Sequence, residues 1–282
     1  MKSLQLHLLR VGACRHLECM AARGGRWRSV AFPALCGLIR HPELGWMLFD
    51  TGYADHFLTA TTQWPERMYR MALPLDLPDN EVLRTQLSGF GLVPADIGTV
   101  VISHYHGDHI AGLRDFPAAR FIASAEDTRQ FAQLRGHRWR ATLGGHLPGL
   151  LPDDYFMRVV AAEDAPRCEL PPWLRPFVNG FDLLGDGSMI GILLPGHSHG
   201  QLGLYLPDAN GRPALLVADA CWSLPALREG RLPAFPALWV NAERRRYVAT
   251  FRGLTDIALR EPSMALLPSH CPSAWQEYQD AA

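Results

Sequence analysis

Ser103-His104-Tyr105-His106-Gly107-Asp108-His109 is the stretch that decides the fold and the chemistry of this 282-residue chain. It directly follows the apolar run Val100-Val101-Ile102, so we expect it on the loop that leaves a buried strand. Three imidazoles this close together would repel one another once protonated. A bound metal ion removes this repulsion, because it holds the imidazoles neutral and the carboxylate ionised. The stretch therefore predicts a metal site.

The spacing inside this stretch allows a second ion. In an extended or turning loop, His104 and His106 can point the same way and chelate one ion. Asp108 and His109, around the corner, can then face another. Nitrogen and oxygen ligands without a thiolate favour zinc, with iron, manganese or cobalt as alternatives.

Composition and charge indicate a soluble globular protein. The chain is 48% hydrophobic with a formal net charge of −1, which gives no reason to expect a nucleic acid partner. Its length suits one domain. No apolar run approaches the roughly 20 residues that span a bilayer, and the run at 4–9 is too short for a signal peptide. Six cysteines without a C-x-x-C pair are typical of reduced thiols, so we expect a cytoplasmic protein, either monomeric or homodimeric.

Strand-like runs recur along the chain, and helices separate the later ones. The alternation of Leu4, Leu6 and Leu8 predicts a first strand. Further strands are expected at 34–39, 46–49, 99–102, 120–123, 189–194, 202–206, 214–217 and 264–267. From periodicity alone this mixture is α/β or α+β, with two sheets packed face to face and helices outside.

Three helix starts can be read from polar residues. Ser124 and Asp127 form a variant of the capping box that opens a helix running through Leu134. Asp79 or Asn80 is expected to cap a helix that reaches about residue 88. Asn241 is expected to open the longest helix, which reaches about residue 259.

Two segments, 61–78 and 136–176, are expected to be ordered covers. Both carry aromatic side chains, and the first adds methionines, which hints at an apolar or acyl-bearing small-molecule substrate. His137 and His146 lie in the second segment and could meet substrate, although a solvated surface position is the commoner fate of such histidines.

Other residues suited to metal binding follow other predicted strands. These are Asp50-Thr51-Gly52, His197 within Pro195-Gly196-His197-Ser198-His199-Gly200, Asp219, and His270. Together with the opening stretch, they resemble in kind and order the H-x-H-x-D-H signature and accompanying motifs of the metallo-β-lactamase superfamily. The resemblance spans residues 50–270 and implies an α+β fold, a four-layer αββα sandwich, formed by residues 1–282 as a single domain.

The resemblance also implies roles for individual residues. One ion would be held by His104, His106 and His197, and a second by Asp108, His109 and His270. Asp219 would bridge the two ions, and Asp50 would orient a ligand through a hydrogen bond. His199 is expected to be structural or to lie beside the ligands, and Cys221 and Cys271 to be packed thiols.

Paired ions imply a hydrolase. Two ions about 3.5–4 Å apart can share a water and lower its pKa toward about 7, which gives a bridging hydroxide. Such a hydroxide opens a lactone or cleaves an ester-type bond, and Asp108 or Asp219 would pass a proton to the leaving oxygen.

Within the superfamily, the N-terminal third is most similar to the N-acyl homoserine lactone lactonase branch. The features are Val11-Gly12 with Cys14, then Phe32-Pro33-Ala34, then Asp50-Thr51-Gly52. That branch usually has a tyrosine shortly after the bridging aspartate. Trp222 stands there instead, and its indole can donate a hydrogen bond but cannot titrate. The stretch between His109 and His197 is also longer than usual, which fits an enlarged cover.

Two alternatives stay open. A thioesterase of the glyoxalase II type would normally add a helical region after the last metal histidine, and only twelve residues follow His270. A non-catalytic ligand-binding or regulatory member of the fold would be expected to have lost ligands, whereas this chain has the full set.

Overall fold

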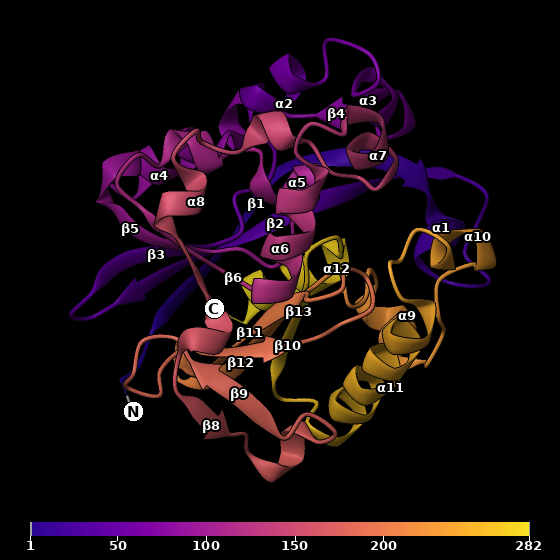
Figure 1. Cartoon of the computed structure of the whole chain (residues 1–282). Coiled ribbons are helices and arrows are strands. Elements are labelled where there is room, and N and C mark those ends of the chain that lie inside the picture. The colour runs from indigo at the N-terminus through magenta and orange to yellow at the C-terminus, as the bar shows by residue number, and fades with distance from the viewer. Residues whose placement is uncertain (1, 282) are drawn as a thin grey trace.

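Alternating side chains along the strands build two β-sheets that share one buried layer. In β3 (Gly45–Phe49), Met47 and Phe49 pack between the sheets, whereas Leu48 packs against the helices outside. Residues 215 and 216 of β12 (Arg212–Ala218) divide in the same way. The computed structural model, which describes residues 2–281, thus has four layers in space: helices, a sheet, a second sheet, and helices again (Figure 1). The predicted α+β, four-layer αββα sandwich is confirmed.

Both sheets are mixed. Within the described residues, the first has seven strands in the spatial order β4 (Leu75–Asp76), β1 (Gln5–Leu17), β2 (Ser29–His41), β3, β5 (Ile97–Val101), β6 (Arg120–Ala123) and β7 (Val159–Ala161). The second has six in the order β13 (Ala265–Pro268), β12, β11 (Leu202–Ala209), β10 (Ile190–Leu193), β9 (Asn179–Asp182) and β8 (Arg167–Glu169).

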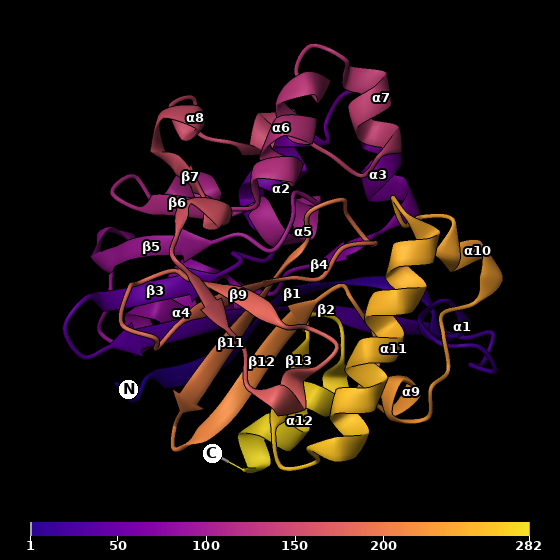
Figure 2. The same cartoon turned by 60° about the horizontal axis from the view of Figure 1, so that its bottom comes forward.

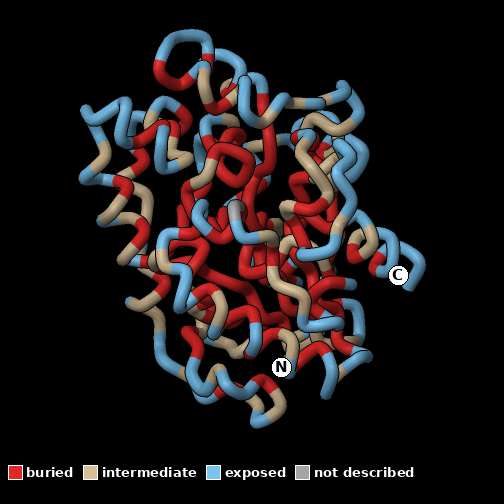
Figure 3. Tube along the Cα trace, turned by 90° about the vertical axis from the view of Figure 1, so that its right-hand side faces the viewer, coloured by how far each residue is buried: buried red, intermediate tan, exposed pale blue. Residues whose placement is uncertain are grey.

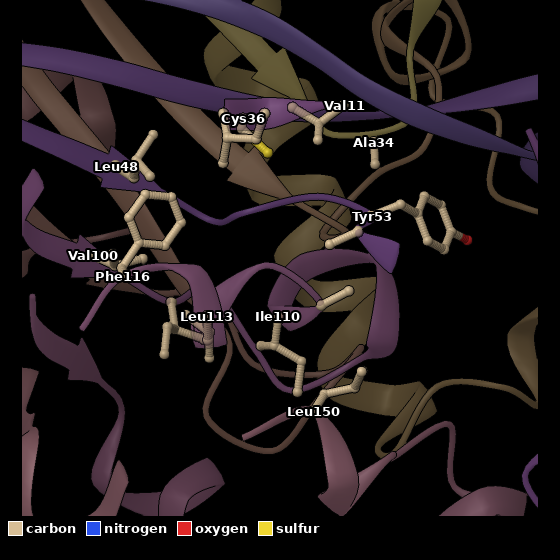
Figure 4. Packing of buried hydrophobic residues seen from close by; sticks show 14 of the residues in the cluster. Val11, Ala34, Cys36, Leu48, Tyr53, Val100, Ile110, Leu113, Phe116 and Leu150 are labelled. Carbon is tan, nitrogen blue, oxygen red and sulfur yellow. The ribbon is translucent and has the colours of Figure 1, made fainter. Parts of the chain in front are cut away.

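Helices cover the outer face of each sheet. The first sheet is covered by α2 (Asp55–Ala60), α3 (Arg67–Ala72), α4 (Leu83–Gly89), α5 (Gly107–Ile110), α6 (Ala125–Leu134) and α8 (Tyr155–Arg158). Figure 4 shows part of this layer, with Leu48 and Val100 of the sheet near Phe116. The second sheet is covered by α9 (Leu224–Arg228) and α11 (Arg244–Arg260), and α11 lies along β11–β13 (Figure 2).

The other helices lie at the edges of these layers. They are α1 (Glu18–Ala21), α7 (Arg138–Leu143), α10 (Phe235–Leu238) and α12 (Pro272–Asp280), with 3₁₀ turns η1 (Asp79–Glu81), η2 (Pro94–Asp96), η3 (Leu113–Asp115), η4 (Pro148–Leu150), η5 (Ala162–Asp164) and η6 (Pro172–Leu174). Buried backbone runs through the interior, and exposed stretches lie at its periphery (Figure 3). Among the helices within residues 2–281, none combines the length and apolar character needed to cross a bilayer.

Strand direction gathers the chemistry-bearing loops at one edge of the sandwich. In the first sheet, β3 and β5 are parallel neighbours. In the second, β12 and β13 are parallel, and β10 runs the same way because β11 is antiparallel to both β10 and β12. Parallel strands end at the same edge, so the residues that follow these five strands meet there.

The structure confirms one of the three predicted helix starts and contradicts the other two. Ser124 caps α6 by accepting a hydrogen bond from the Asp127 backbone N–H at 3.1 Å, as predicted. The cap at Asp79 or Asn80 is wrong, since these residues lie in η1 and α4 begins only after Val82. The cap at Asn241 is also wrong. The helix expected there, α11, begins only after Glu243, because the Asn241 side chain bonds to His197 and does not cap the helix.

The two expected cover segments contain regular structure. Segment 61–78 contains α3 and β4, an edge strand of the first sheet. Segment 136–176 contains α7 and α8 together with β7 and β8, which are edge strands of the two different sheets. The Glu66 carboxylate accepts two hydrogen bonds from the Arg138 guanidinium, at 2.8 and 2.7 Å, so the segments are also joined to each other.

His41 links the two sheets away from the metal-type residues, and its loss should destabilise the fold. Its ring is 1% exposed, accepts hydrogen bonds at Nδ1 from the backbone of Glu43 and Leu44, and donates from Nε2 to Asp186 at 2.9 Å. We expect His41→Ala to lower the free energy of unfolding by about 1–3 kcal/mol in urea denaturation, because it removes a buried ring and the hydrogen bonds by which that ring joins the two sheets. The exposed His137 is the control: His137→Ala should change stability by less than about 0.5 kcal/mol, and equal losses would contradict this role for His41.

Candidate metal centre

A strained turn after β3 brings Asp50 under the histidine stretch. Asp50 has a φ of 60°, which side-chain-bearing residues rarely adopt. Gly52 follows with a φ of 63°, and a Cβ there would lie 2.4 Å from the Cβ of Val11. Only glycine fits this close approach of the turn to β1, which explains the spacing of Asp50-Thr51-Gly52.

Asp50 then holds the start of the histidine loop through Ser103. The Ser103 backbone N–H donates to Asp50 Oδ1 and the Ser103 hydroxyl to Asp50 Oδ2, each at 2.7 Å. His109 Nδ1 donates to the same Oδ2 at 2.8 Å. Asp50 therefore contacts a histidine of the stretch directly, at the position where the sequence predicts an orienting residue.

In four histidines of the site, Nδ1 is within hydrogen-bond distance of a group that does not belong to the two sets of ligand-type residues. Nδ1 lies 2.8 Å from Asp50 in His109, 3.0 Å from the Asn241 side-chain oxygen in His197, 2.7 Å from the Pro33 carbonyl in His270, and 3.0 Å from the Ser103 hydroxyl in His104. A donor bond from Nδ1 leaves Nε2 without a proton and fixes the direction in which it points. The unprotonated nitrogens are the ones that face the centre.

The first group of inward atoms belongs to His104, His106, His197 and Asp219, which lie within 4.8 Å of one another. His106 Nδ1 is 3.0 Å from both His104 Nε2 and His197 Nε2. Nitrogens that share a tetrahedral zinc ion at about 2.0–2.1 Å are separated by roughly 3.3 Å, so this spacing is close to that of a ligand set.

The second group belongs to Asp108, His109 and His270, also within 4.8 Å of one another. His270 Nε2 lies 3.3 Å from Asp108 Oδ2, and His109 Nε2 lies 3.9 Å from the same oxygen. All three side chains are buried.

Asp219 lies between the two groups with one oxygen toward each. Its Oδ2 is 3.3 Å from His197 Nε2 in the first group. Its Oδ1 is 3.1 Å from His270 Nε2 and 3.3 Å from His109 Nε2 in the second. A carboxylate placed in this way can bind one cation through each oxygen.

Buried atoms without partners show that these residues fit metal ions. Asp219 Oδ1 and His109 Nε2 are fully buried, and neither has a hydrogen bond of acceptable geometry within residues 2–281. Leaving such atoms unpaired is costly, and a cation between them would satisfy both.

The electrostatics of the two groups differ. Burial, together with the neighbouring imidazoles, lowers the pKa of His104 and His106 well below the usual value, so these rings stay neutral and ready to ligate. Burial acts the same way on His109 and His270, but Asp108, Asp50 and Asp219 outweigh it and raise the pKa of His109, as Asp219 and Asp108 do for His270. The second group is thus surrounded by negative charge that attracts a cation.

A tight loop places His197, and sequence reasoning missed its supports. A Cβ on Gly196 would lie 2.1 Å from the backbone nitrogen of Tyr247, so the loop packs directly on the start of α11. On the other side, Asp127 accepts hydrogen bonds from the Ser198 hydroxyl and the Gly200 backbone. Asn241 and Asp127 gave no signal in sequence beyond their capping propensity, because their partners lie far along the chain.

The other residues singled out in the sequence have distinct places. Trp222 Nε1 donates to Asp219 Oδ2 at 3.0 Å, and its ring packs edge-on to His197 with centroids 5.8 Å apart. His199 lies outside both groups, with Nδ1 3.0 Å from Glu243. Cys221 and Cys271 are packed in the apolar cluster under α11, and all six cysteines are free thiols.

Two cover residues approach the centre. The Tyr69 hydroxyl of α3 lies 3.4 Å from Asp108 Oδ1. His146 is half-buried, its ring centroid lies 5.4 Å from that of His106, and its Nδ1 lies 3.2 Å from the Tyr105 carbonyl. A solvated surface position is therefore correct for His137 and wrong for His146, because the residues around 146 pair with the histidine loop.

Two named relatives align with all or part of this chain. N-acyl homoserine lactonase AttM of Rhizobium radiobacter is 26% identical over 287 residues, which cover 100% of this chain and 98% of that protein. N-acyl homoserine lactonase AiiB of Agrobacterium fabrum is 30% identical over 196 residues, covering 66% of this chain and 64% of that protein. The predicted similarity to the lactonase branch is confirmed.

Solved structures share the fold. An N-acyl homoserine lactone hydrolase with the product N-hexanoyl-L-homoserine bound at its catalytic metal centre superposes with a TM-score of 0.71 at 16% identity, over 99% of this chain and 97% of that one. AidC, a dizinc quorum-quenching lactonase, superposes with a TM-score of 0.60 at 16% identity, over 96% and 90%. The family model described as the metallo-beta-lactamase superfamily matches residues 30–239, and we conclude that this chain belongs to that superfamily.

Proposed function

We propose that the protein is a dinuclear metal-dependent hydrolase that opens the lactone ring of acyl-bearing small molecules, with N-acyl homoserine lactones as the first substrate class to test. The observation that carries this proposal is the position of Asp219, with one carboxylate oxygen toward each of two buried ligand groups. Relatives named N-acyl homoserine lactonase that align along the whole chain support the choice of substrate.

In this proposal His104, His106 and His197 hold one ion, and Asp108, His109 and His270 hold the other, with Asp219 between them. When bound, two divalent ions supply the Lewis acidity that activates water and polarises an ester carbonyl. Zinc suits these nitrogen and oxygen donors best, with iron, manganese or cobalt as alternatives. Reduced cysteines agree with a cytoplasmic enzyme, and the active unit is a monomer or a homodimer.

The chain's own residues have separable tasks. Asp50, Asn241 and the Pro33 carbonyl hold three histidine rings so that the inward nitrogens carry lone pairs. Asp108 presents Oδ2 to His270, which leaves Oδ1 as the oxygen that can take a proton and deliver it to the leaving alkoxide of the opened ring. Asp219 has both oxygens among the ligand groups and is less suited to this step.

A substrate panel is the direct test. We expect metal-replete enzyme to hydrolyse acyl homoserine lactones faster than simple lactones, thioesters, aryl esters and phosphodiesters, in kcat/KM measured under one set of conditions. Activity confined to thioesters would overturn the lactonase proposal in favour of a glyoxalase II-like enzyme. Metal binding without turnover of any ester or lactone would favour a non-catalytic member of the fold.

Removing a proposed ligand should remove both metal and activity. We expect His106→Ala to lose turnover by at least about 100-fold and to retain less than one ion per chain by elemental analysis, because the first group then lacks its central nitrogen. His199→Ala is the matched control, since His199 contacts Glu243 and neither ligand group, and it should keep metal and activity. Full metal occupancy in His106→Ala would contradict the assignment.

Trp222 should act through Asp219. We expect Trp222→Phe to lower kcat by about 10-fold, because it removes the donor to Asp219 Oδ2 but keeps an aromatic ring against His197. Trp27→Phe, at a side chain that is 85% exposed, should leave kcat unchanged. Equal rates for Trp222→Phe and wild type would mean that the indole N–H does not orient the carboxylate.

A further inference from the structure

We infer that Tyr69 is a positioning residue of the metal centre, whose phenol hydroxyl fixes the orientation of Asp108 as Trp222 fixes that of Asp219. The inference rests on the proposed function, since it concerns the same two carboxylates. It gives segment 61–78 a direct contact with the metal centre. The sequence does not predict this contact, because Tyr69 is one of several aromatic and methionine residues in that segment.

The two oxygens of Asp108 have different neighbours. Oδ2 faces His270 at 3.3 Å and belongs to the second ligand group. Oδ1 lies 3.4 Å from the Tyr69 hydroxyl. Tyr69 therefore contacts the oxygen that the ligand group leaves free, and it can hold the carboxylate with a single oxygen toward the histidines.

The Tyr69 hydroxyl has a strong physical reason to stay on Asp108. The residue is 9% exposed, and Asp108 is the side-chain acceptor recorded for its hydroxyl within residues 2–281. A distance of 3.4 Å exceeds the usual 2.5–3.0 Å of O–H···O bonds, and such contacts tighten when a site is loaded. A buried donor without an acceptor costs about 1–3 kcal/mol, so the bond is favoured over an unpaired hydroxyl.

Packing holds the Tyr69 ring in place. It meets Phe57 edge-on with centroids 5.5 Å apart, and Phe57 meets Tyr53 in the same way at 5.1 Å. Just before α3, Glu66 is clamped by Arg138 of α7 through two hydrogen bonds. The helix that carries Tyr69 is thus fixed on one side by the core and on the other by segment 136–176.

The two aromatic donors reach the centre from opposite sheets. Trp222 follows β12 of the second sheet and donates to Asp219, so its N–H is already engaged. Tyr69 lies on the helical layer over the first sheet and reaches Asp108. The structure thus puts an indole beside one carboxylate and a phenol beside the other.

Tyr69→Phe tests this role, because it removes only the hydroxyl. We expect the variant to bind the weaker of two Co²⁺ or Zn²⁺ ions about 10-fold less tightly in chelator competition. The absorption spectrum of the Co²⁺-loaded protein should also change. With an acyl homoserine lactone, kcat should fall about 10-fold while KM stays within about two-fold, as expected when ground-state binding is untouched.

Tyr53→Phe is the matched control. Tyr53 belongs to the same aromatic stack and is fully buried, but within the described residues its hydroxyl makes no hydrogen bond to Asp108 or Asp219. We expect this variant to keep wild-type ion affinity, Co²⁺ spectrum and kcat. Urea denaturation of both metal-free variants checks that the two substitutions cost similar stability.

Three outcomes would decide against the inference. Unchanged ion affinity and Co²⁺ spectrum in Tyr69→Phe would overturn it, whatever the turnover. Equal losses in Tyr69→Phe and Tyr53→Phe would overturn it in favour of a packing effect. A rise in KM at constant kcat would make Tyr69 a substrate-binding residue instead. Because the ion-binding measurements need no substrate, they test Tyr69 even if wild-type enzyme fails to open lactones and the proposed function is wrong.

Discussion

The Asp219 carboxylate is the group on which the arrangement of the site depends. It is buried, it directly follows β12 of the second sheet, and its two oxygens face histidines contributed by both sheets. A buried carboxylate is tolerated only when positive charge or hydrogen bonds compensate its lost hydration. Here the neighbouring imidazoles hold its pKa well below the usual value against the effect of burial. The sandwich must therefore bring its two sheets together in one register for this group to be satisfied.

The outer supports of the site come from every layer. Asp50 holds His109 from a turn after β3, Pro33 of β2 holds His270, and Asn241 just before α11 holds His197. None of these three contacts joins neighbours in sequence. Each fixes which ring nitrogen carries the proton, so a displaced layer would change the donor atoms as well as their positions. This coupling explains why the ligand loops sit on strand ends, which are among the stiffest places in a fold.

The two segments predicted to be covers bring side chains to the metal centre. Segment 61–78 brings Tyr69 to Asp108, and segment 136–176 brings His146 beside His106 and Arg138 to Glu66. Because the second segment also supplies an edge strand to each sheet, it cannot move as a free flap without breaking strand pairing. We expect substrate selection to depend on side chains of these segments more than on their opening.

The sequence by itself determined the type of fold and predicted seven ligand-type residues, which the structure brings together in two groups. Their chemistry is local: histidines and aspartates directly after apolar strands are readable because strands and turns follow short-range patterns. Only the tertiary structure decided which atoms of these residues face the centre and which other side chains hold them. That Asn241 bonds to His197 rather than capping a helix, and that Tyr69 reaches Asp108, depend on partners 44 and 39 residues away along the chain. Such contacts are set by how the helices and loops pack on each sheet, and no local sequence pattern encodes a contact between residues so far apart in the chain.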